Sequence, residues 1–172
     1  RAIDDPEDDD ARGQMMLAAA YAGIGFGNAG VHLPHGMSYP VSGMVRSFVP
    51  PGYPGDHAII PHGMSVILNA PSVFRWTAST NPQLHLDAAK IMGAETRGAA
   101  PEDAGNILAD ALIDIMRKTA MPNGLAAVGF TEADIDKLVE GTIPQHRVTK
   151  LSPRPASADD LRELFRGAMR YW

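Results

Sequence analysis

The chain has 172 residues, of which 45% are hydrophobic and 20% are charged, and its formal net charge is −5. This composition suits one globular domain and excludes a disordered protein or a basic nucleic-acid-binding protein. Cysteine is absent, which excludes disulfides and thiolate metal sites, so any metal must be held by His, Asp or Glu.

The N-terminal end carries an acidic leader, residues 1–9, which we interpret as a solvated segment. From about residue 10 to residue 28, apolar and small residues fill most positions, which predicts a helix buried in the protein interior. At its C-terminal end, Gly25, Gly27 and Gly30 satisfy the GxGxxG dinucleotide fingerprint. That fingerprint requires a preceding strand and an acidic residue about 20 residues further on. The preceding residues are helical in pattern instead, so we interpret the glycines as places of close helix packing.

The remaining elements are also predicted to be helices. Pro34 and Pro40 bracket HGMSY, the start of a helix to about residue 48, and the Pro- and Gly-rich residues 49–61 predict a loop. A helix over 61–78 begins at a second PHGMS, and Pro71 should kink or break it. Apolar spacing and capping residues predict further helices over 82–92, 101–119, 131–140 and 157–172. No useful stretch alternates apolar with polar residues, so we expect an all-α fold.

The histidines are the strongest chemical signal. Of six, His35 and His62 stand apart because each begins the tetrapeptide HGMS after a proline. Each would place an imidazole in the first turn of a helix, followed by a glycine that lets a ligand or a backbone come near. Two such helix starts can offer two neutral nitrogens to one divalent metal, or they are helix-cap histidines without a metal. A catalytic site typically has three protein ligands. We interpret His85, on a polar-looking helix face, and His146, in a loop, as structural or surface residues.

Two stretches around these histidines resemble a signature region of the iron-containing (group III) alcohol dehydrogenases: GFGNAGVHLPHGMSYPVSG, residues 25–43, and PHGMSVILNAPSVF, residues 61–74. Residues 124–155, GLAAVGFTEADIDKLVEGTIPQHRVTKLSPRP, resemble the hydroxyacid-oxoacid transhydrogenase branch of that family. The resemblance runs from about residue 8 to the C-terminal helix. It implies an N-terminal domain that binds NAD(P) and a C-terminal helical domain that holds a divalent metal, Fe²⁺ or Zn²⁺, through one Asp and three His.

On this resemblance, residues 1–172 are the helical metal-binding domain. His35 and His62 match the last two histidine ligands. The resemblance places the family's Asp, its first His and the nucleotide-binding domain upstream of Arg1. Tyr39 stands where many members have a histidine implicated in proton transfer, and the transhydrogenase branch shares HGMSYP. A tyrosine could move a proton there, or it could pack with its hydroxyl hydrogen-bonded.

The resemblance also implies a substrate class. In a transhydrogenase the nicotinamide stays bound, a hydroxyacid such as 4-hydroxybutyrate reduces it, and an oxoacid such as 2-oxoglutarate reoxidises it. Carboxylate substrates require a cationic partner. Arg147, Lys150 and Arg154 are the candidates, and they could equally be solvent-exposed charges.

We therefore expect the metal-binding helical half of an NAD(P)-linked oxidoreductase that acts on small hydroxyacids, oxoacids or alcohols and is inactive on its own. An ordinary iron- or zinc-dependent alcohol dehydrogenase and a non-catalytic helical binding module are the alternatives. No signal peptide or ~18-residue apolar run is present, so we expect no membrane partner. The expected location is the cytoplasm in a bacterium or the mitochondrial matrix in a eukaryote. A domain without its partner exposes apolar surface, so we also expect a homo-oligomer.

Overall fold

Every regular element of this chain is a helix. A computed structural model of the chain describes residues 1–172 and contains no strand. The α-helices are α1 (Asp9–Ala29), α2 (Leu33–Gly43), α3 (His62–Ile67), α4 (Ala70–Thr77), α5 (Pro82–Ile91), α6 (Ala104–Lys118), α7 (Ile135–Thr142), α8 (His146–Thr149) and α9 (Ala158–Gly167). Four short 3-10 helices are η1 (Ala78–Thr80), η2 (Pro101–Asp103), η3 (Leu125–Val128) and η4 (Glu132–Asp134). The predicted all-α fold is confirmed.

The chain divides into two compact units, residues 1–31 and residues 32–172. Unit 1 holds the acidic leader and α1. Asp8 caps α1 by accepting a hydrogen bond of 2.9 Å from the backbone N–H of Ala11. Arg1 forms ion pairs of 2.9 Å with Asp8 and 3.1 Å with Asp10. The leader is thus tied to the first turn of α1, where carboxylates also interact favourably with the helix dipole.

The predicted burial of α1 was wrong. Its large apolar side chains are exposed; Met16 is 76% exposed and Ile24 is 63% exposed. A Cβ added at Gly25 or Gly27 would meet no atom within 4 Å, so the predicted close packing is not found either. Unit 1 contains one helix and a short leader, and a single helix has no core of its own in which to bury an apolar surface. None of the chain's helices combines the length and hydropathy needed to cross a bilayer.

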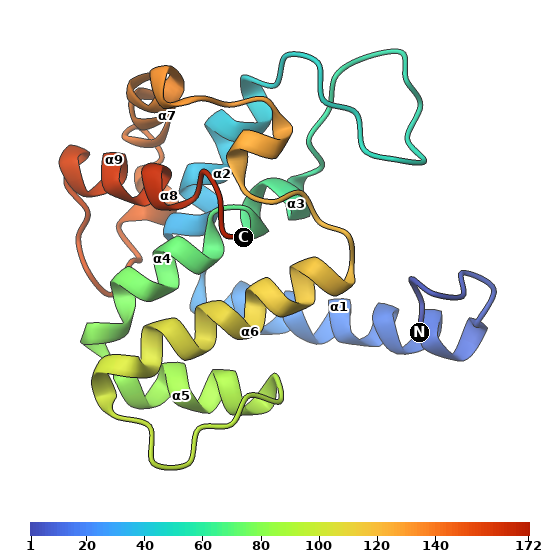
Figure 1. The fold of residues 1–172 in the computed structure, drawn as a ribbon, viewed down its shortest axis with the longest axis horizontal. Coiled ribbons are helices and arrows are strands. Elements are labelled where there is room, and N and C mark those ends of the chain that lie inside the picture. Colours follow the sequence, from blue (N-terminus) through green and yellow to red (C-terminus); the bar gives the residue numbers. More distant parts are fainter. The chain divides into compact units, whose positions relative to one another are not determined.

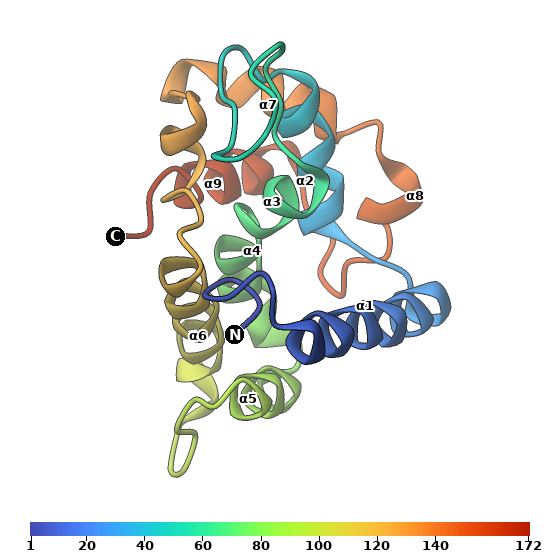
Figure 2. The same cartoon turned by 90° about the vertical axis from the view of Figure 1, so that its right-hand side faces the viewer.

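Unit 2 is built around α2. This helix packs against α3, α7 and α8. Helix α9 contacts both α7 and α4, and α6 contacts both α4 and α5 (Figures 1 and 2). Leu33, Met37 and Val41 recur every fourth residue on one face of α2 and are completely buried. They join Leu138 of α7 and Phe165 of α9 in one hydrophobic core. Burying a side chain of this size stabilises the fold by ~1.5–3 kcal/mol, so this face fixes the position of α2.

Local signals explain most helix boundaries. The predicted helix over 61–78 is broken into α3 and α4 directly before Pro71, as a proline in the first turn of a new helix requires. At α9 the Ser157 hydroxyl accepts from the N–H of Asp160 at 3.1 Å, and the Asp160 carboxylate accepts from the N–H of Ser157 at 2.9 Å. Two predicted lengths were wrong, since α2 ends at Gly43 instead of residue 48 and α9 ends at Gly167 instead of residue 172. The four-residue helix α8 was not predicted.

Candidate metal and substrate site

The two histidines that follow proline in the repeated HGMS motif lie side by side. His35 is in the first turn of α2 and His62 is the first residue of α3, and their ring centroids are 5.3 Å apart with an interplanar angle of 59°. Two imidazoles on one tetrahedral ion, with metal–nitrogen bonds of ~2.1 Å, have centroids about 5 Å apart. The spacing therefore fits two ligands of one metal ion.

The serine of each HGMS motif holds the backbone of its histidine. The Ser38 hydroxyl donates to the His35 carbonyl at 2.7 Å, and the Ser65 hydroxyl donates to the His62 carbonyl at 2.8 Å. Both serines are completely buried. A hydroxyl bonded three residues back has its hydrogen bond satisfied inside the protein. The repeated motif thus makes the same local structure twice.

The two glycines of the motif differ in their surroundings. A Cβ added at Gly36 would lie 2.7 Å from Cγ2 of Thr149 in α8, whereas a Cβ at Gly63 would meet no atom within 4 Å. The predicted need for a close approach is therefore found at Gly36 and not at Gly63. At Gly36 the neighbour is α8, which the missing side chain allows to pack directly on α2.

Burial favours the metal-binding state of the His35 imidazole. Burial lowers the pKa of His35 below the usual value for histidine, and the neighbouring His62 lowers it further. A depressed pKa favours the neutral ring, whose unprotonated nitrogen can donate its lone pair to a cation. No group of three or more His, Cys, Asp or Glu side chains suited to hold a metal occurs in the chain. The chain therefore brings two histidines to this place, whereas the family resemblance implies four ligands.

Tyr39 and Arg147 adjoin this pair. The Tyr39 ring lies against the His62 ring, with centroids 6.4 Å apart and an interplanar angle of 28°. Its hydroxyl accepts a hydrogen bond of 3.4 Å from Nη2 of Arg147, which comes from α8. The structure therefore brings together four of the five predicted site residues: His35, His62, Tyr39 and Arg147.

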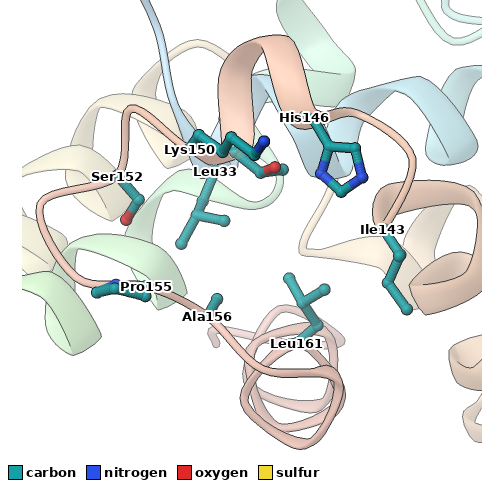
Figure 3. Close-up of a pocket in the computed structure, with 9 residues that line it drawn as sticks. Leu33, Ile143, His146, Lys150, Ser152, Pro155, Ala156 and Leu161 are labelled. Atoms are coloured by element: carbon teal, nitrogen blue, oxygen red, sulfur yellow. The ribbon is translucent and has the colours of Figure 1, made fainter.

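Lys150, the fifth, lines a separate cavity of about 310 Å³. Figure 3 shows Lys150 and His146 on one side of this cavity and Leu161 of α9 on the other. Arg154 is also occupied elsewhere, because its guanidinium lies 4.1 Å from the centroid of the Trp76 ring. Of the three cations suggested by the sequence, Arg147 alone contacts a residue of the candidate site.

His32 is the residue of this region that the sequence analysis missed. Burial is the main cause that lowers the pKa of His32, and the charges of His35 and His85 lower it further. Its buried Nδ1 has no hydrogen-bond partner. His32 is the N-cap of α2 and His35 is its third residue, and these two positions adjoin at a helix start, so the spacing was a usable signal. His85 is buried, contrary to its predicted polar face. Its Nδ1 donates to the Asn81 carbonyl at 2.9 Å and its Nε2 accepts from Thr77 at 3.1 Å, so both nitrogens are satisfied.

Comparison with known proteins decides the family. Residues 1–169 match the model of the Fe-containing alcohol dehydrogenase family, C-terminal. The chain belongs to the iron-containing alcohol dehydrogenase family. The structure of 1,3-propanediol oxidoreductase superposes on 97% of this chain and 40% of its own, with a TM-score of 0.83 at 24% identity. The alcohol dehydrogenase from Oenococcus oeni superposes over the same shares with a TM-score of 0.84 at 23% identity. These two likenesses show the fold.

Curated relatives are closer in sequence. The chain is 55% identical over 170 residues to the probable mitochondrial hydroxyacid-oxoacid transhydrogenase of Dictyostelium discoideum, covering 98% of this chain and 31% of that protein. It is 52% identical over 172 residues to the mitochondrial hydroxyacid-oxoacid transhydrogenase of Homo sapiens, covering 100% of this chain and 37% of that protein. The chain thus spans about a third of the length of these relatives.

Proposed function

We propose that this chain is the helical, metal-binding part of a hydroxyacid-oxoacid transhydrogenase that works with a divalent metal and a bound NAD(P). The observation that carries the oxidoreductase chemistry is the convergence of His35 and His62 from two copies of the same motif. The choice of this branch over an ordinary alcohol dehydrogenase is supported by 52% identity, over the whole chain, to a protein of that name. We also propose a mitochondrial matrix location if the organism is a eukaryote, and a cytoplasmic location if it is a bacterium.

In this proposal His35 and His62 provide two ligands of an Fe²⁺ or Zn²⁺ ion. A bound metal of this kind acts as a Lewis acid on the oxygen of the alcohol or carbonyl substrate. The remaining ligands and the nucleotide-binding domain would belong to the part of such an enzyme outside these 172 residues, consistent with the greater length of the relatives. We accordingly propose that residues 1–172 serve as one helical domain and do not turn over substrate alone.

Tyr39, which lies beside the histidine pair, is the proposed proton-transfer group. Its ring lies against the His62 ring, and its hydroxyl accepts a hydrogen bond from Arg147. When a hydroxyacid is oxidised, the hydroxyl proton must leave as the hydride passes to the nicotinamide, and a phenol within reach of that oxygen can relay it. The reverse transfer would serve the oxoacid.

The test uses the natural protein that contains this chain, purified with its own nucleotide and metal. We expect oxidation of 4-hydroxybutyrate coupled to reduction of 2-oxoglutarate with no nucleotide added. Turnover that appears only after NAD is supplied would identify an ordinary dehydrogenase instead. Absence of turnover with and without NAD would favour a non-catalytic binding module.

A second arm tests the metal ligands. Removing second-shell partners of a metal costs about 10- to 100-fold in affinity, and losing a direct ligand should cost at least as much, so His62→Gln should abolish metal retention. His57→Gln is the matched control, because His57 is exposed and bonds only its neighbour Asp56. Metal per chain is measured by mass spectrometry after dialysis. Equal metal content in both variants would contradict the assignment, and so would tight stoichiometric metal binding by the isolated 172 residues in calorimetry.

A further inference from the structure

One cation stands beside the histidine pair without a carboxylate partner. Arg147 is exposed on α8, and Nη2 of its guanidinium donates to the Tyr39 hydroxyl at 3.4 Å. Tyr39 in turn lies against His62. The guanidinium is therefore one side chain away from the imidazoles that would hold the metal, and most of its five N–H donors remain free for a ligand.

The other arginines of unit 2 are mostly engaged. Four are paired with carboxylates: Arg46, Arg75, Arg162 and Arg166. Two others, Arg117 and Arg154, lie over tryptophan rings. Arg97, Arg147 and Arg170 have no carboxylate within 4.0 Å, and of these three only Arg147 contacts a residue of the candidate site. An unpaired surface cation is common, but one held against a site residue has a defined position in which to receive an anion.

Helix α8 is held firmly enough to position this charge. Thr149 of α8 packs on Gly36, at a distance that leaves no room for a Cβ there. Val148, which lies between Arg147 and Thr149 in the sequence, is buried and also lies close to Gly36. Gly36 directly follows His35 in the chain. The element that carries Arg147 is thus packed on the same turn of α2 that carries one of the two imidazoles.

We propose that Arg147 binds the carboxylate of the hydroxyacid and oxoacid substrates, while their reacting oxygen lies at the His35–His62 pair. The inference rests on the proposed function and adds the residue that separates acids from plain alcohols. A guanidinium matches a carboxylate with two parallel hydrogen bonds, which a lysine cannot reproduce. Both substrates of such an enzyme are acids and would occupy the site in turn, so one fixed cation serves both halves of the reaction.

The experiment measures reduction of the bound nicotinamide in the natural protein, followed by its near-ultraviolet absorbance in a single half-reaction. The donors are 4-hydroxybutyrate and 1-butanol, which share a four-carbon chain and differ in the carboxylate. In Arg147→Gln we expect kcat/KM for 4-hydroxybutyrate to fall by about 10- to 100-fold more than kcat/KM for 1-butanol, the range for a hydrogen bond to a charged group, because loss of the contact with Tyr39 would affect both donors alike. Arg147→Lys should recover part of the loss.

A second measurement does not depend on the alcohol. Butyrate carries the carboxylate without the hydroxyl, so its inhibition constant against 4-hydroxybutyrate should rise by a similar factor in Arg147→Gln. Arg170→Gln, which removes an exposed cation away from Tyr39, is the control and should leave both constants unchanged.

Three outcomes would overturn the inference. An equal loss on both donors would assign Arg147 a purely structural role. No loss on either donor would show that the carboxylate does not reach it. An acid-selective loss in Lys150→Gln without one in Arg147→Gln would place the carboxylate in the other cavity. Failure of the wild-type protein to oxidise any hydroxyacid is a different result, which refutes the proposed function itself.

Discussion

The contact between α2 and α8 can be tested by comparing the two glycines of the repeated motif. In Gly36→Ala the new methyl would lie 2.7 Å from Cγ2 of Thr149, while in Gly63→Ala it would meet open space. Replacing a helical glycine by alanine gains ~0.5–1 kcal/mol in either helix, so this gain largely cancels when the variants are compared. What remains is overpacking at Gly36, which costs ~1–3 kcal/mol.

We therefore expect Gly36→Ala to be less stable than Gly63→Ala by ~1–3 kcal/mol, or roughly 2–12 °C in Tm for a chain of this size. Thermal and urea unfolding followed by far-ultraviolet circular dichroism measure both quantities. Thr149→Ser removes the offending methyl and keeps the hydroxyl that donates to the Gln145 carbonyl at 3.1 Å. The double variant Gly36→Ala/Thr149→Ser should then regain most of the loss. Equal stability of the two alanine variants, or no recovery in the double variant, would refute a tight α2–α8 contact.

Three further outcomes are expected. Burial raises the pKa of Asp134, but hydrogen bonds from Thr131 and Arg46 outweigh burial and hold it below the usual value. A carboxylate of this kind stabilises the fold above its unfolded pKa of about 3.9, and the contribution is lost as pH falls through the lower folded value. Asp134→Asn should thus cost ~1–3 kcal/mol at pH 7, and urea titrations should show the cost shrinking below about pH 4. Gly124→Ala should cost more than about 3 kcal/mol, because φ is +72° and the methyl would lie 2.5 Å from the Met169 carbonyl oxygen; wild-type stability in thermal unfolding would contradict this. The exposed apolar face of α1 should make the isolated chain self-associate, and a monomer in light scattering at high concentration would count against it.

The helices were predictable where the signal is local. Apolar residues spaced by three and four gave α6, capping residues gave the start of α9, and a proline marked the break before α4. Helix α8 was missed because four residues are too few for a periodic pattern, and its packing on Gly36 is a contact between segments more than 100 residues apart. The exposure of α1 was missed for a related reason, since an apolar sequence indicates a surface that needs covering without indicating what covers it.

The site shows the same division between local and long-range information. That His35 and His62 would each lie in the first turn of a helix follows from the proline that precedes each of them, which acts within a few residues. That the two helix starts would face each other is a tertiary fact, for which the repetition of HGMS was the only hint in the residues themselves. The hydrogen bond between Arg147 and Tyr39 joins residues 108 positions apart and had no local signal at all.

The arrangement of α8 gives a physical reason why these residues depend on one another. Thr149 of this short helix packs on Gly36, and Arg147 donates a hydrogen bond to Tyr39. Lys150, the residue after α8, lines the neighbouring cavity. A side chain at position 36 would displace α8 and with it the guanidinium, without touching either imidazole. Gly36→Ala should therefore impair use of hydroxyacids more than retention of metal, whereas His62→Gln should abolish both. If Gly36→Ala instead lost metal and acid selectivity together, the histidine pair and Arg147 would not be separable parts of the site.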